Sequence, residues 1–176
     1  MIQFLDLLTN IINKYKNNSN LNTLTKTRLL KIAYLIELKY YRKNKLRLTN
    51  EDWVYYKFGP YLFNYDNLLQ KYPLINKNDN TESEFTNIDI DESFELPKLD
   101  IEITTIIGSV IKEYGDMDFN KLLDYIYFET EPMIVAEERG DKLDFSNAKT
   151  EDYFKIKSFK NPKDVMKIMK KKIKKR

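Results

Sequence analysis

Apolar side chains recur at helical spacing in two segments near the start of the chain. The first stripe consists of Phe4, Leu7, Leu8, Ile11, Ile12 and Tyr15. The second consists of Leu29, Ile32, Ala33, Ile36 and Tyr40, and it leaves Arg28, Lys31, Lys39 and Arg42 on another side of the same helix. Such stripes are typical of amphipathic helices that pack on a core. The pattern predicts two helices, with the 27–41 segment central to the core and the four basic residues forming a basic flank.

The next segment is rich in aromatic residues around a Gly-Pro step. Residues 49–52 supply a helix cap followed by acids that suit a helix N-terminus. Gly59 tolerates the backbone angles of a tight corner, and Pro60 has its φ already set for a first helical turn. We therefore expect a helix, a corner at Gly59-Pro60, and a second helix from Pro60 to about Lys71.

Helical periodicity is lost over residues 76–98, where Asn, Asp, Thr and Ser are prominent. The alternation of residues 88–91 is that of a half-buried strand, which favours a short β-hairpin or an ordered loop around residues 84–96. Helical spacing returns from Ile101 to Tyr114. Asp118 can cap a further helix that runs to about Phe128, and Pro132 suits the first turn of another.

The expected fold class is therefore mainly α, a compact single-domain helical fold with a short β-hairpin or ordered loop around residues 84–96. A chain of 176 residues suits one domain and buries a sizeable core. We expect this domain to cover residues 1–160. Residues 161–176 are expected to form a C-terminal helix with a basic tail, beginning at an Asn-Pro step.

Composition argues against catalysis. The chain has no Cys and no His, which removes thiolate nucleophiles, imidazole bases and the usual zinc ligands. Its four glycines are not clustered, so the common phosphate-binding loops are absent. Two acidic pairs, Glu129 with Glu131 and Glu137 with Glu138, could be acid/base or Mg²⁺ pairs, but adjacent or alternate acids on a helix point apart. We expect no enzyme activity, no cofactor and no metal.

The net charge of +3 conceals three blocks of alternating sign. Residues 14–47 are strongly basic, with Glu37 as the one acid; residues 79–102 are strongly acidic; residues 163–176 are again basic. These blocks could pair within the fold, present separate surfaces to partners, or simply be solvated faces. No apolar run approaches the ~18 residues of a membrane span, and the start lacks a signal-peptide n-region, so we expect a cytoplasmic protein without a membrane partner.

Several short motifs occur in a recognisable order. They are Leu-x-Lys-Ile-x-Tyr-Leu at 29–35, Phe58-Gly59-Pro60-Tyr61, a Tyr-Gly stop at 114–115, Leu-Leu-Asp-Tyr-Ile-Tyr at 122–127, and Thr-Glu-Pro at 130–132. In this order they resemble the Panacea domain, also called the SocA-like antitoxin domain. The residues that carry the resemblance, and that we interpret as mostly structural, include Leu29, Lys31, Tyr34, Tyr125 and Pro132.

The resemblance implies a non-enzymatic antitoxin of a toxin-antitoxin system. Members typically neutralise a cognate toxin protein by direct binding, and one acts as an adaptor that delivers its toxin to an ATP-dependent protease. Seven aromatics crowd into positions 53–65, and one helix face cannot bury them all. Some of these aromatics belong to the core, while others could anchor an interface. The candidate partner-binding residues are Trp53, Tyr55, Tyr56, Phe58, Gly59, Pro60 and Tyr61.

Two alternative functions stay open at this point. The basic tail could contact phosphates, which would make the protein a DNA-associated transcriptional regulator. A phage or mobile-element protein that binds a host factor is the other alternative. No segment shows base-reading side chains, so nucleic acid is not the partner we expect. The tail residues concerned are Lys170, Lys171, Lys172, Lys174, Lys175 and Arg176.

Overall fold

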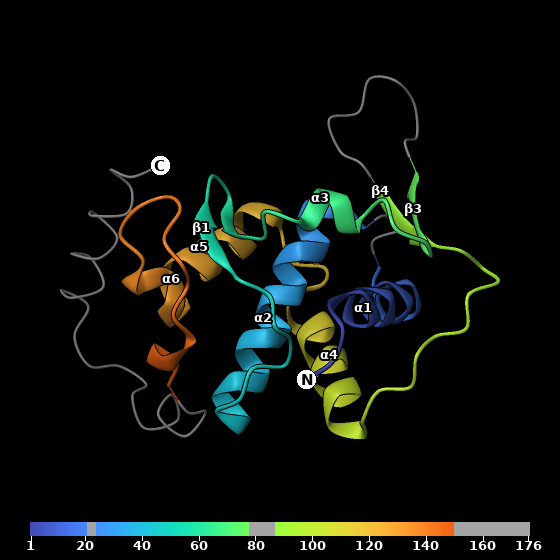
Figure 1. The fold of residues 1–176 in the computed structure, drawn as a ribbon, viewed down its shortest axis with the longest axis horizontal. Helices are drawn as coiled ribbons and strands as arrows, with labels where there is room; N and C mark the ends of the chain where they lie inside the picture. The colour runs from blue at the N-terminus through green and yellow to red at the C-terminus, as the bar shows by residue number, and fades with distance from the viewer. Residues whose placement is uncertain (21–23, 78–86, 150–176) are drawn as a thin grey trace.

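The structure is a computed structural model that describes residues 1–20, 24–77 and 87–149 (Figure 1). Its longer helices are α1 (Phe4–Asn18), α2 (Lys26–Asn44), α4 (Ile101–Tyr114) and α5 (Phe119–Glu129). Short helices are α3 (Tyr65–Leu68), α6 (Glu131–Val135) and the 3-10 turn η1 (Phe145–Asn147). Two antiparallel hairpins complete it, β1 (Val54–Tyr56) with β2 (Gly59–Tyr61), and β3 (Leu74–Lys77) with β4 (Asn87–Ile90). The expected mainly α fold with a short hairpin is confirmed.

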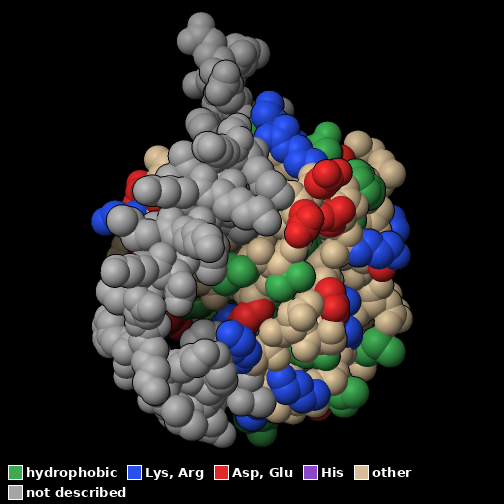
Figure 2. All heavy atoms as spheres, turned by 90° about the vertical axis from the view of Figure 1, so that its left-hand side faces the viewer, with side chains coloured by type: hydrophobic (Ala, Val, Ile, Leu, Met, Phe, Trp, Pro, Cys, Tyr) green, Lys and Arg blue, Asp and Glu red, His purple; other side chains and the backbone are tan. Residues whose placement is uncertain are grey.

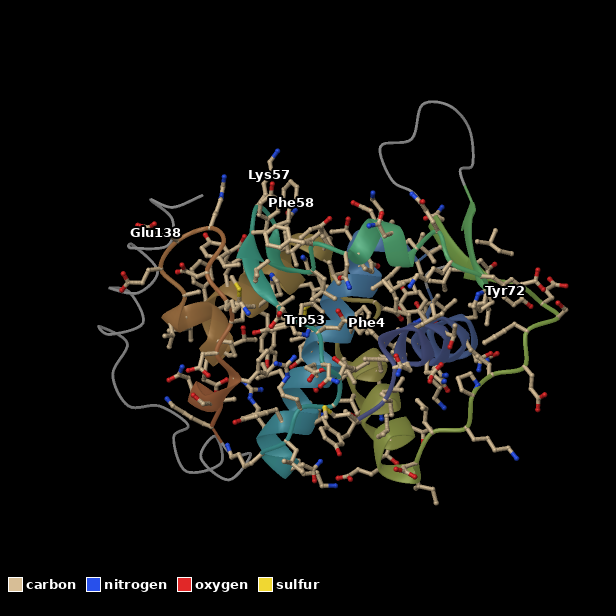
Figure 3. The ribbon with its side chains drawn as sticks, in the orientation of Figure 1. Phe4, Trp53, Lys57, Phe58, Tyr72 and Glu138 are labelled. Atoms are coloured by element: carbon tan, nitrogen blue, oxygen red, sulfur yellow. The ribbon has the colours of Figure 1, made fainter. Side chains whose placement is uncertain are left out.

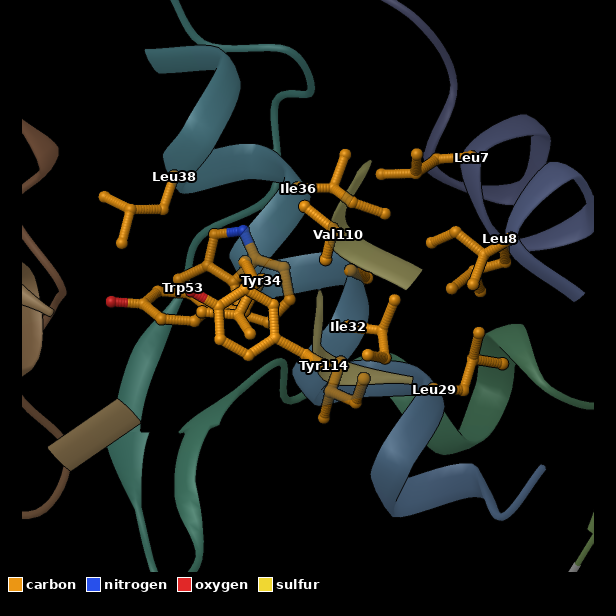
Figure 4. Close-up of a cluster of buried hydrophobic side chains, with 14 of the residues drawn as sticks. Leu7, Leu8, Leu29, Ile32, Tyr34, Ile36, Leu38, Trp53, Val110 and Tyr114 are labelled. Carbon is orange, nitrogen blue, oxygen red and sulfur yellow. The ribbon is translucent and has the colours of Figure 1, made fainter. Parts of the chain in front are cut away.

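Helix α2 is the centre of the molecule. Every residue from 28 to 38 is buried, so other parts of the fold surround α2 on all sides over this stretch. Figure 1 shows α1 and α4 on one side of α2 and the α5–α6 pair on the other. In Figure 4, Leu7 and Leu8 of α1 and Val110 and Tyr114 of α4 converge on the α2 side chains, which include Leu29, Ile32 and Ile36. The prediction that the 27–41 segment is central to the core is confirmed.

The helix ends follow from local chemistry. The Thr25 hydroxyl accepts from the Arg28 amide at the start of α2, and the Asp118 carboxylate accepts from the Asn120 and Lys121 amides at the start of α5. Such side-chain acceptors satisfy backbone donors that the first helical turn leaves unpaired. The Asp118 cap and the first-turn position of Pro132 in α6 are as predicted.

The prediction of a helix, a corner and a helix around Gly59-Pro60 is wrong. Gly59 and Pro60 lie in strand β2, where Gly59 pairs with Tyr56 and Pro60 pairs with Tyr55. Gly59 has φ +87°, a conformation that favours glycine, and it follows directly on the Lys57-Phe58 turn. The helix expected over 60–71 shrinks to the single turn of α3.

The predicted helix cap at residues 49–52 is also wrong. The Thr49 hydroxyl donates to the buried Glu37 carboxylate of α2, at 2.7 Å. This contact joins residues twelve positions apart, so the chain after α2 is held against the helix instead of starting a new one. Strand β1 begins five residues after Thr49, at Val54.

The β3–β4 hairpin contains the strand that alternation predicted. Residues 87–90 form β4, and its partner β3 precedes the expected 84–96 range. Ile88 and Asp89 of β4 are buried, and Asp89 pairs with Lys16 of α1. The predicted C-terminal helix and basic tail, residues 161–176, lie outside the described residues.

Candidate functional site

Exposed aromatic side chains gather at the β1–β2 hairpin and just after it. Tyr56 is 45% exposed, Phe58 is 53% exposed and Phe63 is 69% exposed, while Tyr61 is half-buried. The ring centroids of Tyr56, Tyr61 and Phe63 lie 5.4–6.3 Å apart in each pairing. Single exposed apolar residues are ordinary on protein surfaces, but a contiguous cluster marks an interaction site. We call Tyr56, Phe58, Tyr61 and Phe63 the hairpin surface.

The tip of the hairpin projects outward from the body of the protein. Figure 3 shows Lys57 and Phe58 at this tip, whereas Trp53 lies inside and faces Phe4. The Lys57 ammonium lies 5.5 Å from the centroid of the Phe58 ring. The tip therefore presents an aromatic ring and a cation together.

The structure divides the seven predicted partner-binding residues into two groups. Trp53 is 1% exposed and packs edge-on against Phe4 and Tyr34, with ring centroids 5.9 and 5.5 Å away. Tyr55 is also buried, with its ring 6.0 Å from that of Tyr127, and the backbone positions Gly59 and Pro60 are buried as well. Only Tyr56, Phe58 and Tyr61 of the seven reach the surface.

A distant segment holds the hairpin in place. The Tyr55 amide donates to the Asp141 carbonyl, and the Leu143 amide donates to the Trp53 carbonyl, each at 2.8 Å. On the other side the Tyr127 hydroxyl of α5 donates to the Lys57 carbonyl. Because both sides of the hairpin are bonded to the body of the fold, its aromatic rings sit on an anchored support.

A pocket of about 180 Å³ lies beside the hairpin surface. It is formed by the start of α2, the β1–β2 hairpin and α3. Its lining residues are Lys26, Thr27, Leu30, Lys31, Tyr56, Lys57, Phe58, Gly59, Tyr61, Tyr65 and Asp66.

Lys31 is not part of an exposed basic flank, which corrects the prediction from the sequence. Its side chain is 2% exposed, and its ammonium donates to the Pro60 carbonyl at 2.7 Å. Removal from water lowers the pKa of Lys31 to about 7, because burial penalises the charged form. The family-pattern lysine of α2 is thus bonded to the Gly-Pro step of the hairpin.

Replacing Lys31 by Met is expected to change how stability depends on pH. A lysine whose pKa is lowered on folding binds fewer protons in the folded state, so the wild-type protein gains stability as pH rises above 7. Relative to Lys31→Met, this gain should reach about 2 kcal/mol between pH 7 and pH 9. Urea unfolding of both proteins at several pH values measures it. A difference in stability between the two proteins that stays constant with pH would contradict the lowered pKa of Lys31.

Asp66, at the edge of the pocket, accepts hydrogen bonds from two neighbouring side chains. Asp66 of α3 accepts from the Lys26 ammonium at 3.3 Å and from the Tyr61 hydroxyl at 3.1 Å. The Tyr65 hydroxyl donates to the Lys26 carbonyl at 2.7 Å. Burial is the main reason that the pKa values of Tyr61 and Tyr65 are raised. Asp66 therefore has two partners already, while the Lys31 ammonium lies deeper.

Three of the other family-pattern residues are buried, and Tyr125 is partly buried against the core. Leu29 is fully buried in α2, and the Tyr34 hydroxyl donates to Thr130 at the α5–α6 junction, at 3.1 Å. Tyr125 stacks at a tilt on Tyr114, with ring centroids 4.8 Å apart. Pro132 is buried in the first turn of α6. The Tyr34 bond connects α2 to the α5–α6 junction, and the Tyr125 contact connects α5 to α4, which is consistent with a structural interpretation.

Most of the predicted basic flank is engaged inside the fold. Arg28 donates to the carbonyls of Gly115 and Met117 beyond the end of α4, at 2.9 and 2.8 Å. Arg42 pairs with Glu131 at 2.6 Å, and Lys39 lies 3.8 Å from Glu113. The flank therefore bonds to the second half of the chain instead of forming a free phosphate-binding surface.

The charge blocks partly pair with one another. Lys16 pairs with Asp89, and Lys43 pairs with Glu102 at 2.7 Å, which joins the first basic block to the acidic block. On the face shown in Figure 2, acidic and basic side chains of the described residues are interspersed rather than segregated by sign. The basic residues 170–176 lie outside the described residues.

Sequence reasoning did not place Phe63 in the candidate site, nor did it find the pocket. The sequence signal that could have identified Phe63 is the two-residue spacing of Tyr61, Phe63 and Tyr65, which is compatible with side chains that alternate between buried and exposed positions. Tyr65 is buried and Phe63 is exposed. The pocket had no sequence signal, because α2, the hairpin and α3 must be assembled before it exists.

Within the described residues, no helix has the length and apolar character needed to cross a bilayer. No group of three or more acidic side chains in this part of the chain is arranged to hold a metal ion.

Comparison with known proteins agrees with the motifs. No curated protein and no solved structure gives a significant match to this chain. The family described as antitoxin SocA-like, Panacea domain, matches residues 29–132, which span most of α2, both hairpins, α3, α4, α5 and the start of α6. The match covers more than half of the chain and includes the hairpin surface and all the residues that line the pocket except Lys26 and Thr27. The chain belongs to the SocA-like antitoxin family of Panacea domains.

Proposed function

We propose that this protein is an antitoxin that neutralises a cognate toxin in the cytoplasm by direct protein–protein binding through the hairpin surface. The observation that carries the proposal is the cluster of exposed aromatic rings on an anchored hairpin. Membership of the SocA-like antitoxin family supports the class of function.

The chemistry of the hairpin surface suits a protein partner. Aromatic side chains dominate the binding energy of many interfaces because they bury a large area and lose few rotatable bonds. Phe58 and Phe63 are exposed by more than half, so they have area to bury on a partner. The backbone bonds to residues 140–143 fix the strand that carries Tyr56, which lowers the ordering cost of binding.

Replacing Phe58 or Phe63 by Ala should weaken binding to the cognate toxin at least tenfold, because each change removes an exposed ring that a partner would bury. The toxin is identified as a neighbouring open reading frame that is toxic when expressed alone. Isothermal titration calorimetry gives the affinity, and growth of cells that express both proteins gives the neutralisation.

Tyr72→Ala is the matched control. Tyr72 is also exposed, at 65%, and Figure 3 shows it at the right-hand end of the molecule, well away from Phe58 at the top. This variant should bind the toxin as the wild type does, and all three variants should keep the wild-type circular dichroism. Wild-type affinity in both phenylalanine variants would refute the proposed surface.

Neutralisation by occlusion and neutralisation by delivery to an ATP-dependent protease have different effects on the cellular level of the toxin. Occlusion, which we propose here, leaves the toxin level unchanged while growth is rescued. Delivery lowers the toxin level in a manner that depends on the protease. Immunoblots of the toxin, with and without the antitoxin, separate the two mechanisms.

A further inference from the structure

The Lys31 ammonium has hydrogen-bonding capacity that the described fold leaves open. An ammonium carries three donors, and the Pro60 carbonyl is its one acceptor among residues 1–20, 24–77 and 87–149. Lys31 is almost completely buried, and it is also one of the residues that line the pocket beside the hairpin. A buried cation requires compensating acceptors. The pocket is the place from which a further acceptor can reach it.

The walls of the pocket are largely apolar. Leu30 of α2 and the aromatic residues Tyr56, Phe58 and Tyr61 of the hairpin surround the approach to Lys31. At about 180 Å³, the pocket is smaller than the 300–1,000 Å³ typical of small-molecule and cofactor sites. Its size suits one or two side chains of a protein partner.

The charges around the pocket favour an anionic occupant. Lys26, Lys31 and Lys57 line it, and Asp66 is the one acidic lining residue. Asp66 is already bonded to Lys26 and to Tyr61, so it does not neutralise Lys31. A carboxylate that enters between the aromatic rings would meet an uncompensated cation at the base.

We propose that this pocket binds an Asp or Glu side chain of the toxin, whose carboxylate accepts a hydrogen bond from Lys31 while a neighbouring apolar group packs on Tyr56 and Phe58. The inference deepens the proposed function and rests on it for the identity of the partner. The proposed Lys31–carboxylate contact adds a charge-assisted hydrogen bond within the aromatic interface, where it is shielded from water.

The Lys31–carboxylate contact makes binding dependent on pH. Lys31 pairs with a carboxylate only when it is protonated, and burial has lowered its pKa to about 7. Binding therefore takes up a proton near neutral pH, and affinity falls as pH rises. The other ionisable groups that face the pocket are Lys26, Lys57 and Asp66, together with Tyr56, Tyr61 and Tyr65.

The test uses two small probes that differ only in charge, 3-phenylpropionate and its neutral analogue 3-phenylpropionamide. Each is titrated into the full chain, and the amide resonances of Lys57, Phe58 and Gly59 report occupation of the pocket. The carboxylate should bind about tenfold more tightly than the amide at pH 6, corresponding to one charged hydrogen bond at 1.4 kcal/mol per decade. This preference should fall at least fivefold by pH 8.5.

Two variants test whether the Lys31 ammonium causes the preference for the carboxylate probe. Lys31→Met should bind both probes equally at every pH, because it keeps an unbranched side chain of similar length but removes the cation. Lys121→Met removes an exposed lysine of α5 that is not part of the pocket, and it should keep the wild-type preference. The wild-type comparison of the two probes stands by itself even if Lys31→Met does not fold.

Two results with the small probes would overturn the inference: equal binding of the two probes by the wild-type protein, or an unchanged preference in folded Lys31→Met. Neither result depends on the toxin. If the carboxylate preference fails but Phe58→Ala and Phe63→Ala lose the toxin, the proposed function stands without the Lys31–carboxylate contact. If the preference holds but those variants neutralise normally, the pocket chemistry stands and the occupant is not the toxin, which overturns the inference as stated.

Discussion

Replacing Glu37 by Ala is expected to lower the free energy of unfolding by about 3–5 kcal/mol, because it removes the acceptor of a buried network. Glu37 is completely buried in α2. Its carboxylate accepts from the Arg47 guanidinium, from the Leu48 and Thr49 amides and from the Thr49 hydroxyl, over distances of 2.7–3.3 Å. The one acid of the first basic block therefore fixes the turn that leads from α2 to β1.

Urea unfolding measures this loss. Glu37→Gln provides a graded comparison, because it keeps the shape but places an amide donor among groups that are themselves donors. It should lose part of the stability that Glu37→Ala loses. Glu129→Ala, an exposed glutamate at the end of α5, is the control and should change stability by less than about 0.5 kcal/mol. A loss below about 1 kcal/mol in Glu37→Ala would show that the network does not hold this turn.

Replacing Trp53 by Ala is expected to cost about 3–5 kcal/mol of stability, because it leaves a large cavity in the core. The indole packs against Phe4 of α1 and Tyr34 of α2, and the Trp53 carbonyl accepts from Leu143. The melting temperature should fall by on the order of 10 °C. Differential scanning calorimetry and near-ultraviolet circular dichroism measure this change.

Phe63→Ala is the matched control for the Trp53 variant. Both changes remove one aromatic ring within a dozen positions of sequence, but Phe63 is 69% exposed. It should therefore keep the wild-type melting temperature within about 2–3 °C while it loses toxin affinity. Trp53→Ala should lose neutralisation only to the extent that it unfolds. Equal stability losses in the two variants would contradict the division between core and surface.

The division of the aromatic segment has a consequence for mutational studies of this protein. Loss of neutralisation on changing Trp53 or Tyr55 reports on folding, because both side chains are buried. Loss on changing Phe58 or Phe63 reports on the surface. A change of Lys31 can affect both folding and binding, because its side chain is buried and also lines the pocket.

Local patterns were sufficient to predict the longer helices α1, α2, α4 and α5. The apolar stripes of α1, α2 and α4 repeat at helical spacing, and the Asp118 cap and the Pro132 first turn depend only on neighbouring residues. The alternation that predicted β4 is also a local signal. The motifs that identify the family are linear as well, so they could be recognised without a structure.

Contacts between distant segments decided the candidate site. Gly59-Pro60 is compatible with a helix start or with a strand, and it became a strand because β1 bonds to residues 140–143 and Lys31 bonds to the Pro60 carbonyl. The pattern of α2 placed Lys31 outside the apolar stripe, but the hairpin covers that side of the helix and buries it. Which aromatic rings face the core depends on the same docking. The sequence by itself determined the longer helices and the family. The hairpin surface and the charged base of its pocket exist only in the assembled fold, because burial depends on contacts between separate segments. Strand β1 bonds to residues 140–143, and Lys31 of α2 bonds to Pro60.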